Sequence, residues 1–66
     1  MTIGRSRAIA IAKGFFVSSE GDVSVQDAIL VGMAWIVTIA PVHKGPATRR
    51  LKIDANNGKV LGYAHD

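Results

Sequence analysis

Residues 49–63 restrict the fold of this chain more than any other segment, because they predict a β-hairpin. Charged and apolar side chains alternate along the first half of this segment, in the order Arg50, Leu51, Lys52, Ile53, Asp54 and Ala55. A period of two indicates a strand with one buried face, here the face of Leu51, Ile53 and Ala55. Asn56-Asn57-Gly58 follows, and these residue types tolerate the positive φ that hairpin turns demand. The chain is therefore expected to end in two antiparallel strands that turn at Asn57-Gly58, the second covering residues 59–63.

A period of two also appears between Val23 and Val31, where β-branched residues recur and proline is absent. Asp27 interrupts this pattern, so the strand is expected to bend there or to lie at an edge of the sheet. Gly32 follows directly and marks a tight reversal before Met33.

The strongest strand in the sequence is the apolar run of residues 34–40. Alternation divides its larger side chains between two faces, with Trp35, Val37 and Ile39 on one and Ile36 and Thr38 on the other. Pro41 either ends the regular pairing or confines this end of the strand to an edge. Trp35 leaves two interpretations open: it packs in the core under the helix, or it anchors an interface, because tryptophan is enriched in binding hot spots.

Residues 6–16, or a slightly longer segment, predict a helix. Apolar residues recur there at three- and four-residue spacing, namely Ala8, Ile9, Ile11, Ala12, Phe15 and Phe16. Ser6 is the expected N-cap, since its hydroxyl can accept a hydrogen bond from an amide of the first turn. Gly14 leaves two alternatives. Either it lies inside one helix that closes near Gly21, which we prefer, or it ends the helix and leaves residues 15–18 as a short strand.

The order of these elements predicts an α+β fold in a single domain, residues 1–66. Residues 43–47 are expected to form a loop, because Gly45-Pro46 interrupts the chain and no periodicity survives there. Three or four consecutive strands joined by short turns make an antiparallel meander. We expect the N-terminal helix to pack on the apolar face of this sheet, because the chain offers no other segment to cover it.

The composition favours association with another chain. A chain of 66 residues buries only about 60% of the surface that its unfolded form exposes, so its stability margin is thin. The absence of cysteine excludes disulfides, thiolate metal sites and thiol chemistry. Nevertheless, 48% of the residues are hydrophobic and the mean hydropathy is positive. We therefore expect a face that is buried against another polypeptide, and a homodimer.

The formal net charge of +3 raises the alternative of nucleic-acid binding. Four basic residues gather late in the sequence, namely Lys44, Arg49, Arg50 and Lys52. Contacts to phosphates need such a group, although a small basic excess is also what an ordinary solubilising surface carries. Base stacking needs aromatic residues beside the charges. Tyr63 is the candidate, since Trp35, Phe15 and Phe16 are expected in the core.

No pattern of nucleophile and base indicates catalysis. The residues that could supply such chemistry are Ser18, Ser19, Glu20, His43 and His65. None of them stands in a nucleophile elbow or triad context, and one helix on a small sheet scarcely encloses a substrate pocket. We expect no enzymatic activity and no cofactor.

A metal site is not expected either. Asp54, Asn56 and Gly58 have the spacing that opens a calcium loop, but Lys59 stands at the sixth position, where glycine is required. Asp54 is instead expected to bind backbone amides of its own turn. His43 and His65 have no carboxylate companion.

The N-terminal segment does not fit a secretory signal. Arg5 and Arg7 precede an apolar run of residues 8–12, and Lys13 ends this run too early, because a signal needs about 7–15 apolar residues. No stretch approaches the roughly 18 apolar residues that span a bilayer. The chain as given is therefore expected to be cytoplasmic, or exported if it is a domain excised from a longer protein.

Three segments resemble the PepSY family across nearly the whole chain. Residues 8–13 are similar to the alanine-spaced opening helix of the family, and residues 35–39 to its central aromatic-x-Val-x-Val strand. Residues 51–61 are similar to its closing strand, Asp-Ala, turn and Gly-Lys-Val signature. The resemblance implies a helix packed on a curved antiparallel sheet, and no catalysis. Family members occur in propeptides of thermolysin-type metallopeptidases, and an inhibitory or chaperone-like action on a peptidase has been proposed for them.

The expected function is therefore the binding of a partner polypeptide, either a regulated peptidase or a second copy of the chain. Sheets recruit partners through an unpaired edge by adding a strand. The expected edges are the strands of residues 23–30 and 59–63. The candidate partner-binding residues are Trp35, Arg49, Arg50, Lys52 and Tyr63.

Overall fold

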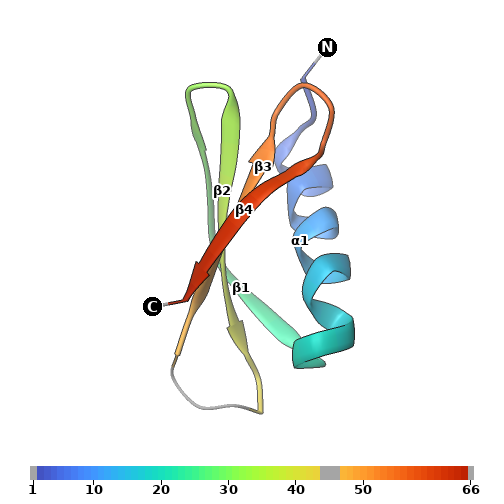
Figure 1. The fold of residues 1–66 in the computed structure, drawn as a ribbon, viewed down its shortest axis with the longest axis vertical. Helices are drawn as coiled ribbons and strands as arrows, with labels where there is room; N and C mark the ends of the chain where they lie inside the picture. Colours follow the sequence, from blue (N-terminus) through green and yellow to red (C-terminus); the bar gives the residue numbers. More distant parts are fainter. Residues whose placement is uncertain (1, 44–46, 66) are drawn as a thin grey trace.

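A computed structural model describes residues 2–43 and 47–65 of the chain, which form one helix and a four-stranded antiparallel sheet (Figure 1). The elements follow in the order α1 (Arg5–Glu20), β1 (Val23–Val31), β2 (Ala34–Pro41), β3 (Arg49–Asp54) and β4 (Val60–His65). Each strand pairs antiparallel with the next, so the order across the sheet is β1-β2-β3-β4. The predicted α+β fold is confirmed, with four strands in the meander. The predicted loop at residues 43–47 includes Lys44, Gly45 and Pro46, which lie outside the described residues.

Helix α1 is continuous through Gly14 and ends at Gly21, so the preferred alternative is confirmed. Gly21 has a φ of 72° and its N–H donates to the Val17 carbonyl at 3.1 Å. Glycine adopts this left-handed φ without the strain that a Cβ would bring. At the other end, the prediction of Ser6 as N-cap is wrong. The Ile3 N–H donates to the Ala55 carbonyl at 2.6 Å, and this tie to the β3–β4 loop starts the helix earlier, with Gly4 as N-cap.

The core lies between α1 and one face of the sheet. From the helix, Ala8, Ala12 and Phe16 are buried, at the four-residue spacing that keeps side chains on one side. From the sheet, the buried residues are Ala28, Val37, Ile39, Leu51 and Ile53. The two helix alanines allow α1 to approach the strands closely, and the phenylalanine fills the space at the C-terminal half of the helix. The predicted inward face of β3 is confirmed, since Leu51 and Ile53 are fully buried.

Phe15 does not belong to this core, contrary to expectation, because its side chain is 41% exposed while that of Phe16 is 2% exposed. Successive residues on a helix point about 100° apart. Only one of the two rings can therefore face the sheet, and the position in register with Ala8 and Ala12 is that of Phe16.

A β-bulge explains the interruption that the sequence has at Asp27. Val25 lies opposite Ile39 and Asp27 opposite Thr38, which leaves Gln26 as an extra residue in β1. The strand is also an edge of the sheet, so both expectations for this position are met. Beyond the bulge the alternation resumes, and Ala28 reaches the core opposite Val37.

The final hairpin reverses where the sequence predicts it. Gly58 has a φ of 76° and its N–H donates to the Asp54 carbonyl at 2.9 Å. The Asp54 Oδ1 accepts from the amides of Asn56 at 2.7 Å and Asn57 at 3.4 Å, as expected for a carboxylate that caps its own turn. The returning strand begins at Val60 and contains a second bulge, because Val60 lies opposite Ile53 but Gly62 lies opposite Lys52. Leu61 is thus the extra residue.

Candidate functional site

Within the described residues, α1 covers one face of the sheet and leaves the other uncovered (Figure 1). We call this second face the open face. Strand register arranges its side chains in three rows across the sheet, which are Asp27, Thr38, Arg50 and Ala64; then Ile29, Ile36, Lys52 and Gly62; then Val31, Ala34 and Asp54. Ile29 is 48% exposed and Val31 is 56% exposed. The open face therefore combines an apolar stripe with charges of both signs.

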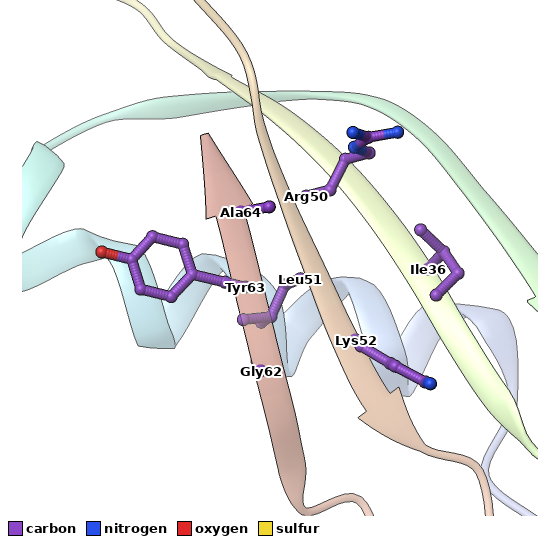
Figure 2. Close-up of a pocket in the computed structure, with 7 residues that line it drawn as sticks. All are labelled: Ile36, Arg50, Leu51, Lys52, Gly62, Tyr63 and Ala64. Atoms are coloured by element: carbon purple, nitrogen blue, oxygen red, sulfur yellow. The ribbon is translucent and has the colours of Figure 1, made fainter. Parts of the chain in front are cut away.

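A groove of about 430 Å³ lies on the open face over β3 and β4. Its lining includes Ile36, Arg50, Lys52, Gly62 and Ala64. Gly62 has no side chain and Ala64 only a methyl group, so the sheet is hollow above β4, while the longer side chains on β2 and β3 form the wall. Figure 2 shows Arg50, Lys52 and Ile36 projecting to one side of the strands and Tyr63 to the other.

The sequence suggested Tyr63 as an aromatic residue beside the basic group. The structure does not place Tyr63 beside Arg50 and Lys52. Tyr63 lies opposite Leu51, on the helix side, and its ring makes edge contacts with Phe15 and Phe16 at centroid distances of 5.8 and 5.7 Å. The Leu61 bulge places Tyr63 on the helix side, because one inserted residue moves every following side chain to the opposite face of the sheet. Without the bulge, Tyr63 would lie opposite Arg50. With it, Gly62 and Ala64 occupy the open face and produce the groove.

Arg49 is also separated from the other basic residues. It lies on the helix side, and its Nε is 3.5 Å from the Glu20 Oε1 at the end of α1. Both side chains are only 12% exposed, so the pair connects the helix to β3 rather than facing solvent. Lys44 lies outside the described residues. Of the four basic residues considered for nucleic acid, Arg50 and Lys52 share the open face.

Trp35 takes the position that its core-packing interpretation implies. Its side chain packs against the core cluster from the helix side of β2. Its indole Nε1 donates to the Ile3 carbonyl at 3.1 Å. This bond holds the segment before α1 against the sheet, a contact between residues far apart in the sequence.

The two edges of the sheet differ in their chemistry. In the middle of β1, the Ala28 N–H donates to the Asp27 Oδ1 at 2.9 Å, and the Ala28 carbonyl accepts from the Arg5 Nε at 3.4 Å. In an antiparallel strand, the N–H and C=O of one residue point to the same side. These two side chains therefore occupy the outward backbone groups of Ala28, in the middle of the β1 edge.

Strand β4 forms the other edge, as expected from the sequence. Residues 60–64 carry no charged side chain. The Leu61 side chain is 54% exposed, and Tyr63 and Phe15 expose 52% and 41% of their side chains. Because both aromatic rings lie on the helix side of β4, this edge has an apolar surface directly beside it.

Two of the residues considered for catalysis make structural contacts. Glu20 pairs with Arg49, and the Ser19 Oγ donates to the Phe16 carbonyl at 3.5 Å in the last turn of α1. Among the described residues, no three His, Cys, Asp or Glu side chains come together as metal ligands. In the same part of the chain, no helix has the length and apolarity to cross a membrane.

No protein-family model, curated protein or solved structure matches this chain. The resemblance to the PepSY family consequently stays a prediction. The candidate site is defined by the geometry of the sheet: a β1 edge that is occupied at Ala28, a β4 edge without charged side chains from Val60 to Ala64, and an open face with a groove.

Proposed function

We propose that this chain is a small non-enzymatic module that binds an extended polypeptide as an additional strand along β4. The difference between the two sheet edges carries this proposal. Arg5 and Asp27 occupy backbone groups at the β1 edge, whereas β4 is an outer strand with no charged side chain from Val60 to Ala64. Long apolar edges without charges are the ones to which another strand adds.

The apolar surface beside β4 would make binding specific for particular polypeptide sequences. In strand addition, main-chain hydrogen bonds supply affinity, and alternate side chains of the added strand supply specificity. Side chains on the helix side would meet the exposed parts of Phe15 and Tyr63. Aromatic rings bury a large apolar area on contact. The expected ligand is therefore an extended segment with apolar residues at every second position.

Leu61 and Leu30 provide a matched pair of variants to test this assignment. Both leucines lie in edge strands, and they are similarly exposed, at 54% and 52%. A lysine in an edge strand opposes pairing with another strand. We expect Leu61→Lys to weaken peptide binding at least about tenfold and Leu30→Lys to change it less than about twofold, since β1 is closed at Ala28.

The measurement uses linear peptides selected against the immobilised full chain from a displayed random library. Each selected peptide is then synthesised with a fluorophore and titrated by fluorescence anisotropy against the parent protein and both variants. Failure to select any peptide would refute the proposed function. Equal weakening by the two lysines would refute the assignment to β4.

The resemblance to the PepSY family supports a narrower proposal, in which the bound polypeptide belongs to a thermolysin-type metallopeptidase. We expect the chain to slow peptide hydrolysis by thermolysin, and Leu61→Lys to remove that effect, because the same edge would contact the enzyme. Initial rates with a chromogenic peptide substrate at saturating chain would measure it. Unchanged turnover would exclude a thermolysin-type peptidase as the partner. Polypeptide binding as such would still be tested by the selection experiment.

A nucleic-acid function receives less support from the same geometry. Arg50 and Lys52 share a face, but Arg49 pairs with Glu20, and Tyr63 lies on the opposite side of the sheet. Binding of single strands combines cations with stacking aromatics on one surface. The described residues do not bring these two features together.

A further inference from the structure

We propose that one end of this domain binds the surface of an anionic lipid bilayer through the β1–β2 turn. We call it the turn end; it comprises residues 29–33, residues 54–59 and the start of α1 at residues 3–7. Figure 1 shows both turns and the start of α1 at one end of the long axis, and the last turn of α1 at the other. The inference does not depend on the proposed function, because polypeptide binding uses the outer edge of β4.

Backbone hydrogen bonds join the three segments of the turn end. The Ala55 N–H donates to the Met33 carbonyl at 2.8 Å, which joins the β3–β4 loop to the β1–β2 turn. The Ala55 carbonyl accepts from the Ile3 N–H at 2.6 Å, which joins the same loop to the segment before α1. The side chains of these segments therefore belong to one continuous surface.

The β1–β2 turn is apolar on all of its sides. None of residues 28–42 carries a charged side chain. Ile29 and Val31 lie on the open face, Leu30 lies on the helix side, and Met33 lies in the turn itself. These four side chains are about half exposed or more, and Met33 is the most exposed at 59%. A partner protein that packs on a sheet covers one face or one edge, whereas lipid surrounds a turn on every side, so this distribution favours a bilayer.

The length of the apolar segment fits a shallow contact with lipid. Elements that bind at the surface of a bilayer bury their apolar side about 5–10 Å into the boundary between headgroups and acyl chains. At about 3.3 Å per strand residue, Ile29 lies about 7 Å from Val31 along β1, and Asp27 lies about 13 Å from it. The apolar residues can therefore reach this boundary while the Asp27 carboxylate stays in water.

Basic residues accompany the apolar turn. The Arg5 Nε donates to the Ala28 carbonyl at 3.4 Å, which places this guanidinium beside the apolar part of β1. Arg7 lies in the first turn of α1, and the Lys59 carbonyl accepts from the Asp54 N–H at 2.8 Å in the β3–β4 loop. A lysine or arginine near an anionic lipid surface strengthens binding by about fivefold.

Acidic residues do not cancel this charge at the turn end. Asp54 is the one acidic residue of the segments that define this end, and its Oδ1 accepts from two amides of its own loop. Glu20 and Asp22 lie at the opposite end, where α1 finishes and β1 begins. Asn56 and Asn57 are exposed in the β3–β4 loop and are polar. We therefore expect the domain to lean toward β1, so that the apolar turn reaches the acyl boundary and the polar loop stays among the headgroups.

Co-sedimentation of the full chain with vesicles tests the role of charge. The vesicles contain either phosphatidylcholine alone or an equal mixture of phosphatidylcholine and phosphatidylglycerol. We expect the chain to bind the mixed vesicles at least about tenfold more tightly than the neutral ones at low salt, because three basic residues lie at the turn end. Binding should weaken as salt is added, and Arg7→Gln should weaken it about fivefold.

Val31→Glu and Val17→Glu form a matched pair of variants for the apolar turn. Both valines are 56% exposed, but Val31 lies at the turn end and Val17 in the last turns of α1. Val31→Glu should weaken binding to the mixed vesicles at least about tenfold, because lipid would desolvate and repel the new carboxylate. Val17→Glu should weaken it less than about twofold, since salt screens a charge at that distance. Circular dichroism would verify that both variants are folded.

A fluorescent label reports directly which residues meet the lipid. The chain has no cysteine, so Met33→Cys and Val17→Cys can each be labelled at a single position with a polarity-sensitive fluorophore. On addition of mixed vesicles, the emission of the label at position 33 should shift to shorter wavelength. The label at position 17 should show no shift.

A parent chain that does not sediment with the mixed vesicles would overturn the proposal. So would equal binding to neutral vesicles, equal binding by the two glutamate variants, or equal shifts of the two labels. If the vesicles stay unbound while Val31→Glu abolishes the binding of selected peptides, the turn is a protein contact and the proposal is also wrong. Leu61→Lys should leave vesicle binding intact, so the failure of polypeptide binding at β4 and the failure of lipid binding can be told apart.

Discussion

Phe16→Ala is expected to cost about 3–5 kcal/mol of folding free energy, the range measured when a buried phenylalanine is truncated. Phe16 is 2% exposed and forms the C-terminal part of the helix contribution to the core. Its ring also contacts Tyr63 of β4 at a centroid distance of 5.7 Å, so truncation loses a link between the helix and the last strand. Native domains are stable by about 5–15 kcal/mol, and small ones lie toward the lower end. The variant should therefore lose most of its stability.

Phe15→Ala is the matched control, because it removes the same side chain one residue earlier. The Phe15 ring is 41% exposed and contacts Tyr63 at 5.8 Å, so it shares one partner with Phe16 but leaves little cavity behind. We expect a loss of about 1 kcal/mol or less. Urea unfolding followed by the fluorescence of Trp35 would measure both. If the two variants lost the same free energy of unfolding, burial beneath α1 would not determine how much each phenylalanine contributes to stability.

Gly58→Ala is expected to destabilise the domain by about 1–3 kcal/mol, for two reasons that act together. The φ of 76° costs a non-glycine residue about 1–2 kcal/mol. The added Cβ would also lie 3.2 Å from the Ile11 Cδ1, so the isoleucine side chain would have to shift against the sheet. Because this position joins the last hairpin to the helix, the effect should extend beyond the turn.

Gly62→Ala serves as the control for this second variant. Gly62 lies in β4, is not among the positive-φ glycines, and has no described heavy atom within 4 Å of the position of a Cβ. A gain of up to about 1 kcal/mol is expected there, since alanine restricts the unfolded chain more than glycine does. Thermal unfolding followed by circular dichroism would compare the two. If Gly58→Ala left the midpoint of thermal unfolding unchanged, neither the positive φ nor the approach to the Ile11 Cδ1 would destabilise the domain.

The elements of this fold were predictable because their signals are local. The alternation of residues 50–55, the Asn57-Gly58 turn, the glycine at 21 and the run of residues 34–40 all act within a few positions in the sequence. Short turns then force neighbouring strands to pair, which determines the order of the meander and both edge strands. The N-cap was the exception, because a hydrogen bond between Ile3 and Ala55 decides where α1 begins.

It was harder to predict which side chains lie on which face of the sheet, because two bulges shift the alternation along the strands. A single extra residue at Leu61 moves Tyr63 to the helix side and brings Gly62 and Ala64 to the open face. Gly62, directly after Leu61, is a local sign of this bulge, since glycine inside a strand often marks one, but alternation is the stronger pattern there. The sequence therefore suggested Tyr63 as the aromatic residue beside the basic group, and the groove could not be foreseen. At Gln26 the bulge did leave a trace, because Asp27 visibly interrupts an apolar pattern.

The sequence by itself determined the hairpin at Asn57-Gly58, the N-terminal helix and a meander of three or four strands, because backbone preferences and periodicity fix these features over short distances. Only the tertiary structure decided which side chains are available for binding. Arg49 is held by Glu20, and Ala28 at the β1 edge is occupied by Arg5 from 23 residues away. Such contacts depend on how α1 lies across the sheet, and no local pattern encodes that placement. For this reason the candidate site narrowed from two possible sheet edges and a group of basic residues to the β4 edge and the open face.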